Sequence, residues 1–552
     1  MAPPDPTLLV AAHAWADQDP DPRTAVELRE LVARAAADAD AAGDLADRFA
    51  SRLEFGTAGL RGELGAGPRR MNRVVVTQAA AGLAAYLSKH PVAGQHGVVV
   101  GYDARHNSDV FARDTAEVMT AAGIPARVLP GPLPTPVLAF AIRHLGAAAG
   151  VMATASHNPP RDNGYKVYLG DGSQIVPPAD ADIAAEIDAV AARPLASIGR
   201  SDAWHTLDDS VVQAYVDAVA ALPSPEAPRD LVLAHTSLHG VGAEVVRRVL
   251  AATGFGPAHE VASQAEPDPD FPTVAFPNPE EPGAIDAGIA TARAVGADVL
   301  VANDPDADRC AVAVPGPDGW RMLRGDEVGV LLADHLLRHG VEGTYATTIV
   351  SSSLLAKLAA SHGQPSVEVL TGFKWIGRVP GLAFGYEEAL GYAVAPHIAA
   401  DKDGISALVR VCELAAMLRA QGLTLLDRLD DLAREHGLHA TDQLSVRVRD
   451  LSLITQAMVR LRQRPPVMLG GLAVEHVADL AVATAVLPAT DGLRFTLAEG
   501  ARVVVRPSGT EPKLKCYLEV VVPVHESPDG ARSRAARQLA DIGADLAPAL
   551  GI

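Results

Sequence analysis

A serine, a histidine and a lysine suited to group transfer stand in VMATASHNPPRDNGYKVY, residues 151–168. Ser156 ends an apolar run, His157 follows it directly, and Lys166 comes ten residues later. A serine hydroxyl is a weak nucleophile that needs a base or an electrostatic partner, and the histidine and the lysine are the candidates. The G-x-S-x-G pattern of a nucleophile elbow is absent, and a serine that only caps a turn is the plain alternative.

Three aspartates suited to metal binding occupy the stretch ADVLVANDPDADRC. Asp304, Asp306 and Asp308 follow an apolar strand at every second position, and carboxylates this close repel one another unless a cation such as Mg²⁺ or Ca²⁺ lies among them. An EF-hand is excluded, because the sixth position of the loop is Arg309 rather than glycine and the twelfth is Pro315 rather than glutamate. We predict a metal loop, with a solvated acidic turn as the alternative. An arginine beside such a loop suits a phosphorylated ligand.

A third stretch, EGARVVVRPSGTEPKLKCYLE, places a short polar loop between two strands. Hydroxyls, a guanidinium and backbone N–H groups that a glycine leaves accessible are together suited to a phosphate dianion. An ordinary hairpin turn is the alternative. The candidate phosphate ligands are Arg506, Ser508, Gly509 and Thr510.

Adjacent carboxylates stand in FGYEEALGYAVAPHIAADKDG, where Glu387 and Glu388 lie between glycines. Such a pair can accept hydrogen bonds from vicinal sugar hydroxyls, and a solvated acidic helix end is the alternative. Upstream, LTGFKWIG predicts a small polar loop that faces the same ligand. Further candidates for substrate binding in these two stretches are Thr371, Gly372, Lys374, His397 and Lys402.

A glycine-rich stretch near the N-terminus, FGTAGLRGELG, has Arg61 as its only cation. The spacing of its glycines is not G-x-G-x-x-G, so it predicts no dinucleotide site. A loop that is glycine-rich for structural reasons is the alternative to a functional one.

One pattern that positions these residues recurs three times: an apolar β-branched run, a Gly/Ser turn and an amphipathic helix that ends at a glycine. The runs are VVVGYD, DLVLAHTSLHGVG and YATTIVSSS, and the helices end at Gly123, Gly254 and Gly363. Such alternation predicts parallel or mixed sheets that helices cover on both faces. The last hundred residues differ, because LAVATAVLP (480–488), LRFTLAEG and ARVVVRPSG predict more closely spaced strands.

We therefore expect the α/β fold class: three similar α/β domains with mixed or parallel sheets, plus a smaller C-terminal α+β domain, around a central cleft. The serine loop falls in a domain at 1–208 and the aspartate loop in one at 209–320. The glutamate loop falls in 321–438, and the phosphate loop in 439–552.

The composition limits the class of protein. The chain has 552 residues, of which 48% are hydrophobic, and a net charge of −20. We expect no nucleic-acid or membrane partner for so acidic a chain. The three cysteines lie far apart, and we identify no signal peptide and no apolar run near the ~20 residues of a membrane helix. We predict a cytoplasmic location.

Four of these stretches, in their order along the chain, resemble the functional loops of the α-D-phosphohexomutase superfamily. TASHNP is similar to its phosphoserine loop, DPDADR to its metal loop, YEEALG to its sugar loop and RPSGTEPK to its phosphate loop. The resemblance extends from FGTAGLRG to the last domain. FGTAGLRG, LTGFKW and the sugar loop are most similar to the branch of phosphopentomutase-type enzymes, related phosphoglucomutases and glucose-1,6-bisphosphate synthase.

The resemblance implies an isomerase of carbohydrate metabolism, which interconverts sugar 1-phosphates and 6-phosphates through a phosphoserine and a bisphosphorylated sugar. It implies Mg²⁺ as cofactor, a sugar 1,6-bisphosphate as activator and a small phosphosugar as partner, and we expect a monomer or homodimer. The last domain would move as the intermediate turns over.

The resemblance also implies roles for single residues. Ser156 would carry the phosphoryl group and hold Mg²⁺ together with the three aspartates. Lys166 would act as general acid and base, for which we expect a crowded cationic site to lower its pKa. Arg61, His157 and Arg309 would orient the phosphoryl group. The two glutamates would hold sugar hydroxyls, and the phosphate loop would hold the phosphate that does not react.

Several alternatives stay open. Ala389 stands where common phosphoglucomutases carry a serine, so pentose phosphates are possible substrates. Within the same chemistry, a phosphopentomutase or a glucose-1,6-bisphosphate synthase is the alternative. Outside this chemistry, the alternatives are a catalytically inactive sugar-phosphate binder and a Mg²⁺-dependent phosphatase.

Overall fold

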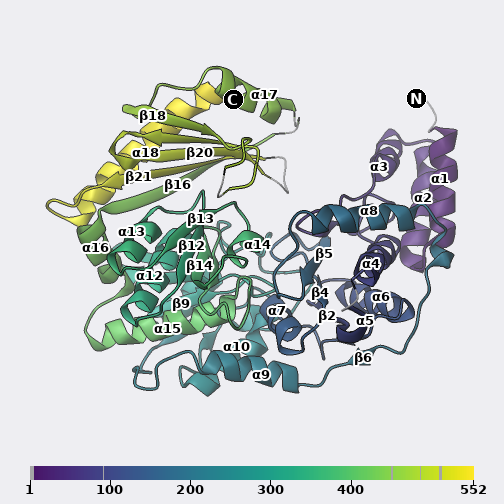
Figure 1. The fold of residues 1–552 in the computed structure, drawn as a ribbon, viewed down its shortest axis with the longest axis horizontal. Coiled ribbons are helices and arrows are strands. Elements are labelled where there is room, and N and C mark those ends of the chain that lie inside the picture. Colours follow the sequence, from purple (N-terminus) through teal and green to yellow (C-terminus); the bar gives the residue numbers. More distant parts are fainter. Residues whose placement is uncertain are drawn as a thin grey trace. The chain divides into compact units, whose positions relative to one another are not determined.

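The computed structural model describes residues 5–90, 93–448, 450, 452–484, 487–508 and 513–551. The chain folds into two compact units (Figure 1). The first contains the chain up to Pro315, Gly319–Met322 and the segment Tyr392–Glu413. The second contains Gly316–Asp318, Leu323–Gly391 and the chain from Leu414 onward.

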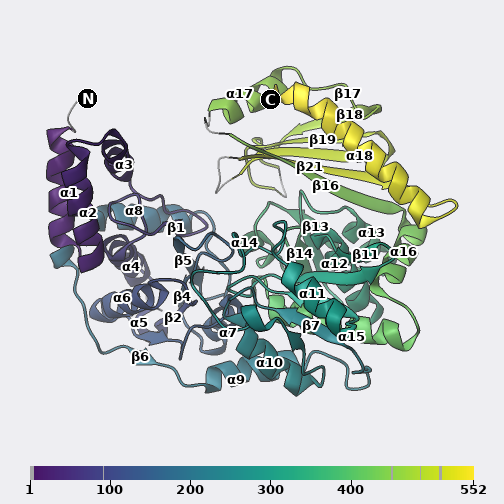
Figure 2. The ribbon, with the colours of Figure 1, turned by 180° about the vertical axis from the view of Figure 1, so that it is seen from behind.

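The first sheet of the first unit has six strands. Their order is β1 (Leu60–Glu63), β5 (Asp162–Leu169), β4 (Ala149–Ala153), β2 (Val98–Tyr102), β3 (Ala126–Val128) and β6 (His205–Thr206). The last four strands are parallel, whereas β5 is antiparallel to both of its neighbours. Five helices belong to this part of the chain: α4 (Arg73–Ser88), α5 (Ala93–His96), α6 (Ser108–Ala121), α7 (Thr135–His144) and α8 (Ala179–Ala191). Helices α4 and α6 lie on one side of the sheet and α7 on the other (Figures 1 and 2).

The alternation of side chains along the strands explains these two layers. Val98 and Val100 of β2 belong to the core that includes α4 and α6. On the opposite face, Gly150 of β4 lies beneath α7, where an added Cβ would be 2.3 Å from Ile142 Cδ1. The missing side chain therefore lets α7 approach the sheet closely.

Three helices precede this sheet and were not predicted from the sequence. They are α1 (Pro6–Gln18), α2 (Pro22–Ala35) and α3 (Ala39–Phe49). An aspartate caps each of them, because the side chains of Asp5, Asp21 and Asp38 accept backbone N–H groups of the first turn. Their buried leucines join the core of the first sheet. The Asp-Pro pairs at two of the three starts are a sequence signal that would have located them.

The second sheet of the first unit has the order β11 (Gly319–Met322), β10 (Ala311–Gly316), β9 (Val299–Ala302), β7 (Leu233–Thr236) and β8 (His259–Glu260). Strands β9, β7 and β8 are parallel, and β10 returns antiparallel to β9. The helices of this part are α9 (Ser210–Ala220), α10 (Gly242–Thr253) and α11 (Asp286–Val295). The turn from β9 to β10 is the aspartate loop, so the sheet itself fixes both ends of that loop.

The third sheet has the order β13 (Ser366–Val369), β12 (Thr344–Thr348), β14 (Leu382–Glu387) and β15 (Gly391–Ala393). It belongs to the second unit up to Gly391, where β15 begins. Strand β12 is parallel to both neighbours. The helices of this region are α12 (Gly325–Arg338), α13 (Leu354–Ser361), α14 (Phe373–Ile376), α15 (Gly404–Ala420) and α16 (Leu425–His436). Helix α15 begins in the first unit, to which the segment Tyr392–Glu413 returns.

The fourth sheet is antiparallel. Its order is β16 (Leu438–Arg447), β21 (Lys513–Val522), β20 (Arg502–Pro507), β19 (Leu493–Leu497), β18 (Leu472–Asp479) and β17 (Met468–Leu469), and its helices are α17 (Ser452–Gln463) and α18 (Pro528–Leu550). Val503 and Val505 belong to the core with α18, whereas Val504 and Tyr517 pack against Ile349 of the third sheet's region. Both faces of this sheet are thus partly covered.

The expected fold class is confirmed: three α/β parts with mixed sheets precede a C-terminal part built on an antiparallel sheet. The strand predicted at 480–488 is wrong. The strand in that region is β18, which ends at Asp479, and the chain then turns, with the N–H of Thr484 donating to the Leu487 carbonyl at 2.9 Å. The domain boundaries and the central cleft stay predictions. In the described part of the chain, no helix combines the length and the apolar character needed to cross a membrane.

Two helical glycines test the packing of the first unit. A Cβ on Gly82 of α4 would lie 2.7 Å from the Ile187 backbone of α8, whereas Gly43 of α3 has open space around it. We expect Gly82→Ala to lower the free energy of unfolding by about 1–3 kcal/mol, because the two helices must separate. Gly43→Ala should raise it by up to about 1 kcal/mol through helix propensity. Thermal unfolding followed by circular dichroism measures both, and equal midpoints would contradict the close contact.

Candidate active site

Ser156 lies at the end of β4, where the chain leaves the sheet. Its φ of 53° is in the left-handed region, and its N–H donates to Thr154 Oγ1 at 2.8 Å. The hydroxyl donates to Asp304 Oδ2 at 2.8 Å and lies 3.1 Å from His157 Nδ1. The serine is buried, with 3% of its surface exposed. The structure therefore brings the predicted serine and metal loops together.

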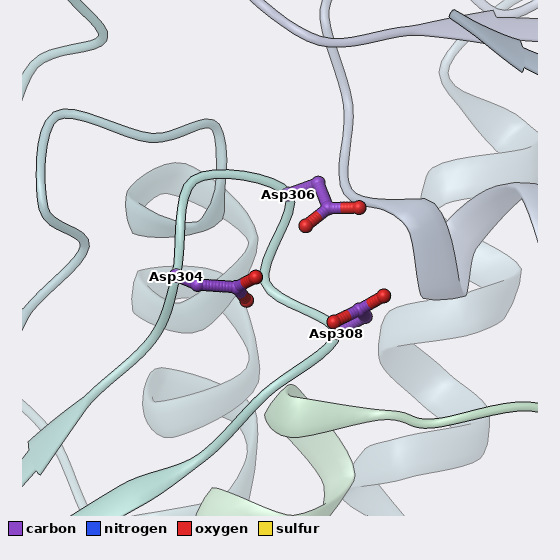
Figure 3. A group of neighbouring side chains, drawn as sticks. All are labelled: Asp304, Asp306 and Asp308. Carbon is purple, nitrogen blue, oxygen red and sulfur yellow. The ribbon is translucent and has the colours of Figure 1, made fainter. Parts of the chain in front are cut away.

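The three aspartates form one buried cluster. Oxygens of Asp304, Asp306 and Asp308 lie within 4.8 Å of one another, and the carboxylates turn toward one another (Figure 3). Thr135, at the start of α7, donates to Asp306 Oδ2 at 2.7 Å. Among the described residues, Asp306 Oδ1 and Asp308 Oδ1 find no hydrogen-bond partner although they are buried. Buried carboxylate oxygens without a donor fit a hard cation such as Mg²⁺.

Lysine ammonium groups neutralise part of this cluster. Lys166 of β5 donates to Asp306 Oδ2 at 2.7 Å and to Asp308 Oδ2 at 3.1 Å. Burial raises the pKa of both carboxyls, but the ammonium outweighs it, so that both pKa values lie below the usual range. Asp304 differs, because burial and the two neighbouring carboxylates raise its pKa well above the usual value.

The pKa of Lys166 does not shift in the expected direction. Burial and the nearby Lys402 and Arg61 lower it, but Asp306 and Asp308 raise it more, and the net shift is upward. The expected lowering is therefore wrong for this arrangement of charges. Lys166 is an ammonium that has protons to donate beside the serine loop.

Three further groups surround the serine loop. Burial and the charges of Arg309 and Arg61 lower the pKa of His157 well below its usual value, so the ring is neutral. Arg309 Nη2 lies 3.4 Å from His157 Nε2, and its Nη1 lies 3.5 Å from a carboxylate oxygen of Glu280. Arg61 donates to Asn158 Oδ1 at 3.0 Å. Two guanidinium groups thus lie beside His157 and Asn158 of the serine loop, where they suit an anionic ligand.

The segment around Lys402 contacts the aspartate loop. Lys402 Nζ lies 3.4 Å from Asp308 Oδ2. Gly404 packs so closely that a Cβ would be 2.2 Å from the Arg309 carbonyl oxygen. His397 is exposed. Partial burial of its ring lowers its pKa, and the positive charges of Arg143 and Arg410 lower it further. The structure therefore brings Lys402, but not His397, to the aspartates.

In the second unit, Glu388 is held at the end of β14 by neighbouring hydroxyls. Its Oε2 accepts from Ser351 Oγ at 2.9 Å and from Thr348 Oγ1 at 3.3 Å. Burial, then the charges of Glu387 and Asp326, raise the pKa of Glu388 to about 7. Ser351 thus donates a hydroxyl hydrogen bond to this carboxylate, whereas the neighbouring Ala389 has no hydroxyl to donate.

The other predicted residues that the structure describes belong to the second unit. Thr371 and Gly372 lead into α14, with a φ of 107° at the glycine that favours this residue type, and Lys374 lies within the helix. Arg506 is in β20, and the Ser508 N–H donates to the Lys513 carbonyl at 2.8 Å. Gly509 and Thr510 lie outside the described residues.

Sequence reasoning missed an ion cluster on the strand that carries Arg506. Arg502 of β20 contacts Glu519 Oε2 at 2.6 Å and Glu368 Oε1 at 2.7 Å, and it also donates to the Ser351 carbonyl. The cluster therefore joins the strand that carries Arg506 to the serine that holds Glu388. A charged residue directly before three successive valines, as in ARVVVRP, was the signal that could have identified it.

Comparisons with known proteins agree with this geometry. Four models of the phosphoglucomutase/phosphomannomutase family match in order: α/β/α domain I at residues 52–193, domain II at 213–317, domain III at 324–436 and the C-terminal domain at 467–525. The chain belongs to the α-D-phosphohexomutase superfamily. It is an enzyme, an intramolecular phosphotransferase that acts as a phosphosugar mutase, in a metal-dependent family.

Relatives within the superfamily carry several substrate names. The chain is 50% identical to a probable phosphomannomutase of Haemophilus influenzae over 81% of this chain and 93% of that one. It is 36% identical to a probable phosphoribomutase of Schizosaccharomyces pombe over 93% and 94%. A crystal structure of a putative phosphomannomutase from Thermus thermophilus matches with a TM-score of 0.69 and 28% identity, over 89% of this chain and 99% of that one.

We expect Mg²⁺ to stabilise the protein through the aspartate cluster. A ligand at a hundredfold excess over its dissociation constant adds about 2.7 kcal/mol to the free energy of unfolding. Asp308→Asn should abolish the rise in the unfolding midpoint that Mg²⁺ causes, whereas the exposed Asp318→Asn should keep it. Differential scanning calorimetry with and without Mg²⁺ measures this, and an equal rise in both variants would contradict the site.

Glu388 should make stability depend on pH. Its pKa is about 7 in the folded protein against an ordinary 4.5, so the folded state binds the proton more tightly and the free energy of unfolding falls as pH rises across that window. Glu388→Gln should flatten this fall, and the exposed Glu342→Gln should not. Urea unfolding at a series of pH values measures the slope. An unchanged slope in Glu388→Gln would contradict its buried, protonated state.

Proposed function

We propose that this enzyme interconverts hexose 1-phosphates and 6-phosphates, that Ser156 carries the phosphoryl group, and that a bisphosphorylated sugar is the intermediate. The observation that carries the proposal is the hydrogen bond of Ser156 Oγ to Asp304 within a buried aspartate cluster that Lys166 contacts. A hydroxyl in this position reaches both a cation site and a proton donor.

The residues of the first unit account for the transfer step. The phosphoryl group leaves Ser156 Oγ for a sugar hydroxyl, the hydroxyl loses its proton, and Ser156 Oγ regains one. Lys166 is the group we assign to this proton exchange, because its ammonium lies in the same cluster as Asp304. Ser156, Asp304, Asp306 and Asp308 would hold Mg²⁺, which when bound offsets charge on the transferring group. Arg61, Arg309 and the neutral His157 orient that group.

The residues of the second unit are assigned to the remainder of the substrate. Glu387 and Glu388 accept hydrogen bonds from sugar hydroxyls, with Thr371, Gly372 and Lys374 as further contacts. Arg506, Ser508, Gly509 and Thr510 bind the phosphate that does not react. Lys402 and His397, which belong to the segment Tyr392–Glu413 of the first unit, complete the predicted set. The intermediate must turn over so that its second phosphate returns to Ser156, and a sugar 1,6-bisphosphate is therefore the expected activator.

A pentose phosphate is the second candidate substrate. Relatives named phosphopentomutase in mouse and human are 35% identical to this chain over 92% of its length. The absence of a hydroxyl at Ala389 is consistent with a changed sugar contact. A glucose-1,6-bisphosphate synthase is a further form of the same chemistry.

One experiment separates these substrates. Glucose, mannose and ribose 1-phosphates are mixed with the enzyme, Mg²⁺ and a trace of hexose 1,6-bisphosphate, and ³¹P NMR follows all products. We expect a hexose 1-phosphate to be converted to its 6-phosphate fastest. Conversion of ribose 1-phosphate alone would move the assignment to pentoses, and inorganic phosphate released at the rate of turnover would replace the mutase by a phosphatase.

Replacement of the serine tests the mechanism itself. Ser156→Ala should lower turnover at least about 10⁴-fold, because the phosphoryl group then has no carrier. The matched control is Ser361→Ala, whose hydroxyl donates to the Leu358 carbonyl of its own helix at 2.8 Å and lies 3.2 Å from His362 Nδ1. Turnover is measured as above, and circular dichroism checks the fold. Activity of Ser156→Ala near that of the control would exclude the phosphoserine mechanism.

A further inference from the structure

One guanidinium holds the backbone of the serine loop. Arg105 follows β2, and only 3% of its surface is exposed. It donates to four main-chain carbonyls between residues 156 and 162: from Nη2 to Ser156 at 2.6 Å and Asn158 at 2.5 Å, and from Nη1 to Pro159 at 2.8 Å and Asp162 at 3.2 Å. The arginine therefore reaches the serine loop from a distant part of the chain, 51 residues before Ser156.

The guanidinium is itself fixed from two sides. Asp103 Oδ2 lies 3.5 Å from Arg105 Nε, and Asp103 Oδ1 accepts from the Arg105 N–H at 3.0 Å. The ring of Phe271 lies beneath the guanidinium, with 4.9 Å between Cζ and the ring centroid. A planar cation between a carboxylate, an aromatic face and four carbonyls has one orientation available.

The contact with the Ser156 carbonyl matters because of the serine's backbone. A φ of 53° is unfavourable for a residue that has a Cβ, and such conformations persist where the surroundings fix them. Arg105 binds the carbonyl of this residue, and it binds the carbonyls of the following turn as well. In this conformation the hydroxyl reaches Asp304.

We propose that Arg105 is a positioning residue, which sets Ser156 Oγ in place for phosphoryl transfer by holding the left-handed turn of its loop. Arg105 touches no reacting atom in this assignment and acts through main-chain carbonyls. The inference rests on the proposed role of Ser156 as phosphoryl carrier. Lysine cannot replace the arginine, because a single ammonium does not span carbonyls that a planar fork with two donor nitrogens holds.

The test uses enzyme labelled with ³²P from glucose 1,6-bisphosphate. Single-turnover transfer from the labelled enzyme to glucose 1-phosphate is compared for wild type, Arg105→Lys and Arg105→Ala, together with steady-state kcat and KM. We expect both variants to lose about 100-fold in the transfer rate and in kcat, with KM within about twofold, because a misplacement near 1 Å costs this much. Added guanidinium ion should restore part of the rate in Arg105→Ala and leave Arg105→Lys unchanged.

The matched control is Arg73→Lys. Arg73 also pairs with a buried carboxylate in the same part of the chain, Asp114 at 2.7 Å, but contacts no residue of the serine loop among those described. Arg73→Lys should lower the midpoint of thermal unfolding and leave the rate of phosphoryl transfer unchanged. If Arg105→Ala does not fold, Asp103→Asn gives the second measurement. This variant weakens the ion pair that fixes the Arg105 guanidinium, so it should also lower kcat, by a smaller factor than Arg105→Ala would.

The outcomes separate the inference from the proposed function. Wild type that takes no label on Ser156 would overturn both. Labelled wild type with Arg105→Lys at the wild-type transfer rate would overturn the positioning role alone. A rise in KM equal to the loss in kcat/KM, with kcat unchanged, would also overturn it, because it would show that Arg105 acts in binding instead of in placing the hydroxyl.

Discussion

Three carboxylates confined within a few ångströms inside the protein are the constraint on which the rest of the site depends. Asp304, Asp306 and Asp308 are 0–1% exposed, so water cannot screen their mutual repulsion. The cluster is tolerable only because cations and donors reach it from several elements. Lys166 comes from β5, Lys402 from the segment before α15 and Thr135 from the start of α7. The fold of the first unit thus brings these groups into contact with the aspartates.

The same constraint explains how the serine acquires a chemical environment. Ser156 does not stand in a triad of serine, histidine and carboxylate, because the ring nitrogen of His157 that faces away from the hydroxyl lies 3.4 Å from the Arg309 guanidinium, where a triad has a carboxylate. Its hydroxyl is instead directed toward the aspartate cluster, while Arg105 holds the backbone behind it. The charge of the cluster and the backbone of the loop are therefore two parts of one arrangement: one creates a place for a cation, and the other brings the phosphoryl carrier to it.

Much of this could be predicted from local patterns, since strand ends and short charged loops are encoded by neighbouring residues. The runs at β2, β7 and β12, and the loops at Ser156 and Asp304, follow from such signals. Arg105 and Ser351 could not be found in this way, because their contacts depend on which strands become neighbours. Lys402 was predicted to bind substrate from its position in the chain, but its contact with Asp308 could not be predicted in this way, because it depends on the return of this segment to the first unit. The prediction of a strand at 480–488 was wrong, because apolar residues alone do not determine where the pairing of β18 with β19 ends.

The most direct test of the central claim is to locate the phosphoryl group on the protein. The enzyme is incubated with glucose 1,6-bisphosphate and Mg²⁺, digested, and mapped by mass spectrometry. This account predicts one phosphoryl group, on Ser156, that disappears when glucose 1-phosphate is added in excess. A phosphoryl group on another residue, or none on Ser156 while the enzyme turns over, would contradict it.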